Sequence, residues 1–153
     1  MGINDARLTE LFAAYEDRTN RALEEPPEVD IEAVAGAFTH CFIAANPKGV
    51  MCGENNEEFR ATIPKGFDFY RSIGTRSMKI ADLTVTPLDD FHVLARVHWV
   101  ARYVRKDGSE ETIEFDVIYL VQVLNDQPRI FGYITGDEEK LYKEKGLLPE
   151  TGP

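Results

Sequence analysis

The chain has 153 residues, of which 43% are hydrophobic and 29% charged; these values are typical of one folded domain spanning residues 1–153, not of a disordered chain. Its 27 acidic residues outnumber its 17 basic residues and give a formal net charge of −10. This charge repels a phosphate backbone or an anionic lipid surface, so neither nucleic acid nor a membrane is expected as a partner.

Targeting and redox signals favour a cytoplasmic protein. No apolar run is long enough to cross a bilayer, and the first ten residues carry mixed charges without the apolar segment of a signal peptide. Cys41 and Cys52 form neither a CxxC pair nor a disulfide framework. Two such thiols suit a reducing compartment.

The first half of the chain has helical periodicity. Between Ile3 and Glu24, apolar residues recur at steps of three and four, and Glu25-Pro26-Pro27-Glu28 ends that helix. Asp30 is the predicted N-cap of a second helix, with Phe38, Cys41 and Phe42 on its buried face, which ends at Asn46-Pro47-Lys48-Gly49.

A short strand and a third helix are predicted next. Val50-Met51-Cys52 has the composition of a strand, and Asn55 with Glu58 forms a capping-box pattern at the start of a helix. The apolar stripe of this helix runs to Ile73, and Pro64 and Gly66 inside it predict a kink or a break. Gly74 ends the helix.

The second half is rich in strand-forming residues. Strands are predicted near Thr75–Thr86, Asp90–Arg105, Glu110–Leu124 and Pro128–Thr135, separated by turn sequences. Short links between consecutive strands require antiparallel pairing. A short helix follows from Asp137, with acids first and Lys143 and Lys145 last, as the helix dipole favours.

The register of the long hairpin follows from its apolar alternation. A three-residue loop, Lys106-Asp107-Gly108, with Gly108 left-handed, pairs Trp99 with Phe115 and His98 with Asp116. A one-residue slip would mix the two faces, so we expect this register, with Trp99 packed under the helices and His98 on the opposite face.

Three helices followed by a long antiparallel sheet, with a short C-terminal helix, resemble the NTF2-like (SnoaL-like) superfamily. The segments 47–53, 69–75 and 131–138, the last reading Phe131-Gly132-Tyr133-Ile134-Thr135-Gly136-Asp137-Glu138, resemble the same proteins. The resemblance implies an α+β cone, in which three N-terminal helices pack on a curved antiparallel sheet. It also implies a dimer and a small apolar ligand, but it names no single function, because the fold hosts isomerases, dehydratases, cyclases and non-catalytic binders.

An apolar binding cavity in such a cone would be lined by aromatic side chains from both walls. The alternative for each of them is ordinary core packing. The predicted ligand-binding residues are Tyr15, Phe42, Phe67, Tyr70, Trp99 and Tyr119.

Isomerase chemistry would need a carboxylate base beside the cavity and a hydroxyl donor for the developing enolate oxygen. Tyr15 resembles the tyrosine donor of the steroid-isomerase-like members, and Glu54 and Asp82 are the candidate bases. The strand that should supply a second acidic donor has Val97, Trp99 and Ala101 instead. The alternative is a core tyrosine and solvated acids. A cofactor-independent isomerase or lyase acting on a polyketide- or steroid-like carbonyl compound is the leading enzymatic hypothesis.

His98 and Asp116 form a second candidate catalytic pair, because the predicted register places them opposite one another. The favoured interpretation of the pair is a charge cluster in a dimer interface. That interface, on the outer sheet face, would contain Leu94, Arg96, His98, Val100, Asp116, Ile118 and Leu120.

No metal or cofactor site is expected. His92 and His98 lie six residues apart on one strand, about 20 Å, too far to share an ion. No phosphate-binding glycine loop is present.

The rival to an enzyme is a non-catalytic ligand-binding or dimeric interaction domain. A desolvated carboxylate in an open cavity would favour catalysis, and a cavity filled by Trp99, Phe67 and Tyr70 would favour the rival.

Overall fold

The computed structural model describes residues 4–148, so the expected helix start at Ile3 lies outside the described residues. Helices alternate with strands before the sheet is completed. In chain order the elements are α1 (Asp5–Leu23), α2 (Ile31–Gly36), β1 (Phe38–Asn46), β2 (Gly49–Glu54), α3 (Glu57–Ser72), β3 (Thr75–Pro87), β4 (His92–Val104), β5 (Glu110–Leu124), β6 (Gln127–Ile134) and α4 (Glu138–Glu144).

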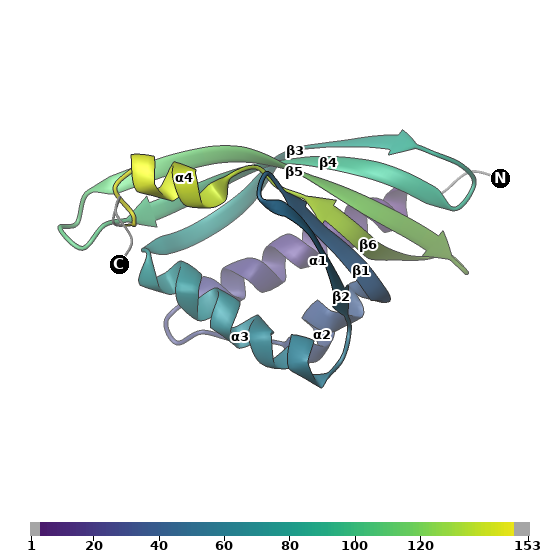
Figure 1. Cartoon of the computed structure of the whole chain (residues 1–153), viewed down its shortest axis with the longest axis horizontal. Coiled ribbons are helices and arrows are strands. Elements are labelled where there is room, and N and C mark those ends of the chain that lie inside the picture. The colour runs from purple at the N-terminus through teal and green to yellow at the C-terminus, as the bar shows by residue number, and fades with distance from the viewer. Residues whose placement is uncertain (1–3, 149–153) are drawn as a thin grey trace.

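The strands form one curved sheet in the order β2-β1-β6-β5-β4-β3. Neighbouring strands are antiparallel except β1 and β6, which run parallel. The sheet is therefore mixed, and the expected purely antiparallel sheet is wrong at this one contact. Figure 1 shows the sheet arching over α1, α2 and α3, with β1 and β2 descending at one end and α4 near the C-terminus.

The predicted second helix is only partly correct. Asp30 caps α2 by accepting a hydrogen bond from the Ala33 amide, but the helix ends at Gly36 and the chain continues as β1. Phe38 and Phe42 are both buried, because a spacing of four residues returns to one face of a strand as well as of a helix. Cys41, expected on the buried helical face, is instead exposed on β1, as is Cys52 on β2.

The β4–β5 hairpin has the predicted register. Trp99 pairs with Phe115 and His98 with Asp116, and Gly108 is left-handed with φ of +89° in the connecting loop. Val93, Val97, Trp99 and Tyr103 are almost completely buried on the concave side of the sheet. The apolar alternation therefore decided which face packs under the helices, as expected.

Helix α1 covers the edge of the sheet at β3. The Asn20 side chain accepts a hydrogen bond from the Met78 amide at 2.8 Å and donates one to the Met78 carbonyl at 2.7 Å. One turn earlier, Glu16 accepts a hydrogen bond from the Ile80 amide at 2.5 Å. These contacts use backbone groups that an edge strand would otherwise leave unpaired, and they fix the rotation of α1.

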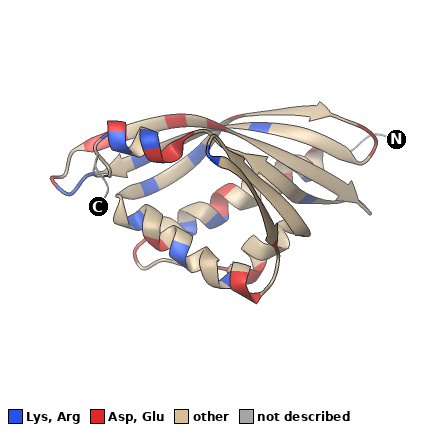
Figure 2. Ribbon diagram, viewed as in Figure 1, with Lys and Arg blue, Asp and Glu red and all other residues tan. Residues whose placement is uncertain are grey.

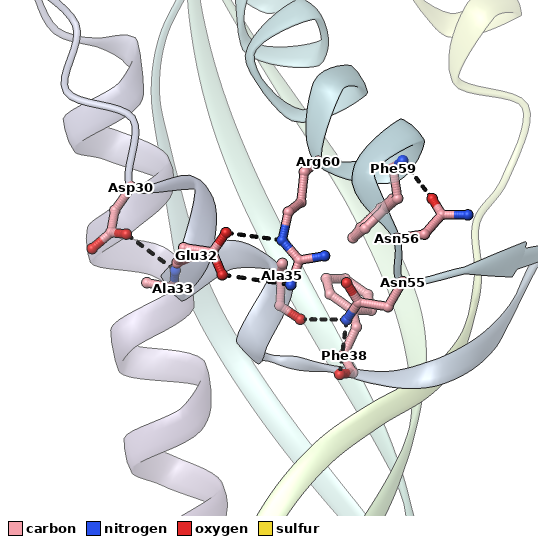
Figure 3. A network of polar contacts seen from close by, with 9 residues as sticks. All are labelled: Asp30, Glu32, Ala33, Ala35, Phe38, Asn55, Asn56, Phe59 and Arg60. Carbon is pink, nitrogen blue, oxygen red and sulfur yellow. Dashed lines mark hydrogen bonds and ion pairs between the residues drawn. The ribbon is translucent and has the colours of Figure 1, made fainter.

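A polar corner joins α2 to the start of α3 (Figure 3). Asn56, not the predicted Asn55, is the N-cap of α3 and accepts a hydrogen bond from the Phe59 amide. Asn55 points inward and donates to the carbonyls of Ala35 and Phe38, while Arg60 forms an ion pair with Glu32. These contacts tie α2 to the start of α3.

Helix α3 is continuous through Pro64, so of the two expected alternatives, a kink or a break, the break is wrong. Gly74 follows the helix with φ of +93°, and a Cβ at this position would lie 2.2 Å from the Val104 carbonyl oxygen. Only glycine fits this close approach. The predicted end of the helix at Gly74 is therefore confirmed, and its cause is the packing of Gly74 against Val104. Within residues 4–148, no helix is both long and apolar enough for a membrane span.

Candidate functional site

A cavity of about 790 Å³ lies between the concave face of the sheet and the helices α1 and α3. The sheet contributes Trp99, Phe115, Val117, Tyr119 and Tyr133, and the helices contribute Tyr15, Phe67 and Tyr70. The β1–β2 turn contributes Lys48, Gly49 and Val50. A space of this size accommodates a small organic molecule.

The aromatic wall of the cavity is held by hydrogen bonding and ring contacts. Trp99, 1% exposed, donates a hydrogen bond from Nε1 to the Tyr119 hydroxyl at 3.2 Å. The Tyr15 ring packs against both, with centroids 6.0 Å from Trp99 and 5.8 Å from Tyr119. These rings are positioned by β4, β5 and α1, so one cavity wall is rigid.

Five of the six predicted ligand-binding residues line this cavity: Tyr15, Phe67, Tyr70, Trp99 and Tyr119. Phe42 is not among the lining residues; its ring packs against two that are, with centroids 5.4 Å from Phe38 and 4.9 Å from Phe59. Its ring also fills the space over Gly53, where a Cβ would lie 2.8 Å away. Phe42 is therefore a packing residue.

Glu138 places a carboxylate at the cavity wall, although the sequence predicted only that it lies among the acids at the start of the C-terminal helix. The carboxylates of its two neighbours already have partners: Asp137 caps α4 by accepting a hydrogen bond from the Lys140 amide, and Glu139 forms ion pairs with Lys48 and Lys143. Glu138 has no ion pair within residues 4–148, and burial raises its pKa. One signal could have found it: Glu138 lies one helical turn before the buried Tyr142 and shares its face.

Tyr15, Tyr70, Tyr119 and Tyr133 line the same cavity as this carboxylate. Burial raises the pKa of Tyr15 to about 12, and the charge of Glu138 contributes to the same shift. Burial and then Glu138 also raise the pKa values of Tyr70 and Tyr133. These phenols therefore keep their protons at neutral pH and can donate hydrogen bonds to an oxygen atom inside the cavity.

The cavity wall also contains two cations with different surroundings. Lys48 forms an ion pair with Glu139 at 2.6 Å, whereas Arg18, one turn after Tyr15 on α1, has none within residues 4–148. Figure 2 shows charged residues on the helices and also along strands of the sheet, while the strand β1 carries none. Within residues 4–148, Arg18 and Glu138 are the charged groups of the lining that have no ion pair.

The predicted bases Glu54 and Asp82 do not line this cavity. Glu54 is exposed at the end of β2. Asp82 is exposed opposite His98, because the pairing register shifts between Ile80 and Asp82 and the strand changes which residues face inward. Met78 and Ile80 point toward the core, but after the shift Leu83 and Val85 do so instead of Asp82 and Thr84.

His98 and Asp116 are in contact, but on the convex face of the sheet. The Nδ1 atom of His98 lies 2.6 Å from Asp116 and its Nε2 atom 2.8 Å from Glu114, while Arg96 reaches the second oxygen of Asp116 at 3.2 Å. Hydrogen bonds to Glu114 and Asp116 raise the pKa of His98. The network is a surface charge cluster separate from the cavity.

The part of the chain that the structure describes holds no group of three or more His, Cys, Asp or Glu side chains arranged to bind a metal ion. The cavity accordingly offers hydroxyl groups, one carboxylate and one guanidinium as its reactive or recognition groups. This set can transfer a proton and hold a developing anion.

Solved structures share the fold at low sequence identity. An NTF2-like protein with a cystatin-like fold from Novosphingobium aromaticivorans superposes with a TM-score of 0.63 and 17% identity over 94% of this chain and 88% of that one. Aln2 from a Streptomyces species gives 0.62 and 14% over 91% and 93%. A ketosteroid isomerase-like protein from Erwinia carotovora atroseptica gives 0.59 and 15% over 86% and 93%.

The sequence comparison is more specific. No curated protein sequence matches this chain. The model of an NTF2-like family, DUF6841, matches residues 5–138, which span all the strands and reach Glu138. The predicted resemblance is confirmed, and the chain belongs to the NTF2-like family DUF6841.

Proposed function

We propose that this protein binds a small, mainly apolar carbonyl compound in its cavity and catalyses a proton transfer on it without a cofactor, as an isomerase or lyase. The observation that carries the proposal is the isolated carboxylate of Glu138 at the wall of an aromatic cavity. A carboxylate whose pKa is raised by burial is a stronger base once ionised than an exposed one.

The proposed roles follow from the chemistry of the lining. Glu138 removes a proton from the carbon next to the carbonyl group, which leaves an enolate. In an isomerase Glu138 then returns the proton at another position; in a lyase the enolate expels a leaving group. The Tyr15 hydroxyl donates a hydrogen bond to the enolate oxygen that forms, because its own proton is retained at neutral pH. The Trp99–Tyr119 hydrogen bond holds the wall against which the apolar body packs.

Hydrogen–deuterium exchange into 2-tetralone, an apolar ketone with acidic α-hydrogens, tests the catalytic role. Wild-type protein is expected to accelerate α-exchange in D₂O, measured by NMR, and Glu138→Gln is expected to lower this rate at least about 100-fold. Glu144→Gln is the matched control, because it removes an exposed carboxylate of the same helix that is absent from the lining and pairs with Lys140 instead of with a lining residue. Equal rates for wild type and Glu138→Gln would favour a non-catalytic binder.

Binding itself can be followed separately. Trp99 is the single tryptophan of the chain and lines the cavity, so its fluorescence reports occupancy. Gly66 also lines the cavity, and a Cβ there meets no atom within 4 Å, so Gly66→Leu should obstruct the space and weaken 2-tetralone binding. Gly36→Leu, equally free of contacts but outside the lining, should leave binding unchanged.

We also propose that the protein forms a homodimer through the convex sheet face. Leu94 lies directly opposite Leu120 on this face, and Ile118 lies beside Ile134, which is 42% exposed. The first three side chains are partly exposed, and contiguous apolar surface of this kind marks association surfaces. Sedimentation velocity at micromolar concentration should give a dimer, and a monomer would contradict the proposal.

A further inference from the structure

Arg18 differs from the other arginines of this protein. Seven of them, Arg7, Arg21, Arg60, Arg71, Arg96, Arg102 and Arg105, each have a carboxylate within ion-pair distance. Arg76 and Arg129 have none within residues 4–148, but both are exposed to water. Arg18 also has none there, although it is partly buried. Removing a guanidinium from water without an anion is unfavourable, so an external anion would stabilise it.

The position of Arg18 is set by the contacts that fix α1. Glu16 and Asn20 bind the backbone of β3 on either side of it in the sequence. Tyr15, Arg18 and Thr19 line the cavity from one face of the helix, at spacings of three and four residues. The Thr19 hydroxyl is already used, because it donates to the Tyr15 carbonyl. Arg18 is thus the charged group that α1 presents to the cavity.

The rest of the lining specifies what the anion is attached to. Val34, Phe59, Ile63 and Met78 line the cavity along with Arg18, and the aromatic residues lie across from them on the sheet. Lys48 is already paired with Glu139, and Glu138 would repel a second negative charge. The cavity therefore suits an apolar body with a single negative group rather than a phosphate ester.

We propose that the ligand is an apolar carboxylic acid whose carboxylate is bound by Arg18. This inference rests on the proposed function and narrows its substrate to a carbonyl compound that also carries a carboxylate. A guanidinium pairs with both oxygens of a carboxylate through parallel hydrogen bonds, which fixes the orientation of the ligand. The rest of the ligand then occupies the cavity that Glu138 and Tyr15 also line.

A matched pair of probes tests the inference by calorimetry: 1-naphthylacetate and its neutral analogue 1-naphthylacetamide. Wild-type protein should bind the acetate at least about tenfold more tightly than the amide at pH 7. Arg18→Gln should abolish this preference and leave the affinity for the amide unchanged. Arg21→Gln removes the same charge from the same helix outside the cavity lining, so it should retain the preference.

A second measurement uses only the wild-type protein. Raising the salt concentration should weaken binding of the acetate and leave binding of the amide unchanged, because salt screens the ion pair. Equal affinities of wild type for the two probes, or a preference that survives in Arg18→Gln, would overturn the role of Arg18 while leaving the cavity proposal intact. Binding of neither probe would contradict the cavity proposal itself.

Discussion

Three consecutive acids, Asp137, Glu138 and Glu139, occupy three different environments at the start of α4. Asp137 caps the helix, and Glu139 is held ionised by Lys48 and Lys143, which lower its pKa to about 2. Glu138 alone faces the cavity, where burial raises its pKa. At the scale of a residue, the fold thus gives one of three chemically similar groups the properties of a base.

This environment predicts a pH dependence of stability. The folded state holds the Glu138 proton to higher pH than the unfolded chain does, so the free energy of unfolding falls as pH rises from the ordinary value of 4.5 through the raised pKa. Glu138→Gln has no charge to desolvate and should become progressively more stable than wild type over that range. Denaturant titrations between pH 4 and 9 measure the difference.

The matched control for that experiment is Glu144→Gln. Glu144 is exposed on the same helix, outside the cavity lining, and pairs with Lys140, so its substitution should leave the trend at Glu138 in place. A stability difference between wild type and Glu138→Gln that stays constant across the pH range would show that Glu138 is not desolvated in the folded protein.

At the scale of elements, α1 acts as a cover for an edge strand. Glu16 and Asn20 bind backbone groups of Ile80 and Met78 that no neighbouring strand occupies, since β3 ends the sheet. The same contacts set the direction in which Tyr15, Arg18 and Thr19 point. The polar face of α1 therefore both protects the sheet edge and orients the cavity wall.

Asn20→Ala tests this element contact. The substitution leaves the amide and the carbonyl of Met78 without their partner and should lower the free energy of unfolding by about 2 kcal/mol. Asp17→Ala, which removes an exposed ion pair with Arg21 on the same helix, should change it by less than about 0.5 kcal/mol. Urea denaturation compares the two, and equal effects would contradict the role of Asn20.

At the scale of the whole molecule, the two proposed functions, ligand binding and dimerisation, lie on opposite faces of the sheet. The concave face carries Trp99 and Tyr119 to the cavity, and the convex face carries the His98 cluster and the apolar residues Leu120 and Ile118. Because successive residues of a strand point to opposite faces, one hairpin supplies both surfaces.

The proposed dimer makes stability depend on protein concentration. Association stabilises the folded state by mass action, so the midpoint of thermal unfolding should rise as the protein concentration is increased from about 1 to about 100 μM, as scanning calorimetry can measure. Ile118→Lys should remove this dependence by placing a charge in the interface. Ala13→Lys, on the exposed face of α1, should retain it. A midpoint independent of concentration in the wild type would contradict the dimer.

Local patterns in the sequence determined much of the fold. The alternation from Val93 to Tyr103 fixed the faces of β4, and one glycine in a short loop fixed its pairing with β5. The Asp30 cap and the end of α3 at Gly74 were likewise predicted, because capping and left-handed backbone depend on single residues. The family could also be recognised from the order of elements.

Only the tertiary structure decided the strand at residues 38–46, the direction of Asp82 and the make-up of the cavity, because each of these depends on contacts between distant segments. Residues 38–46 have a spacing that fits helix and strand alike, and parallel pairing with β6 selects the strand. The register shift at Asp82 depends on β4, so no pattern within β3 could remove that acid from the list of bases. Glu138 and Arg18 become a site only because α4 and α1, at opposite ends of the chain, line one cavity.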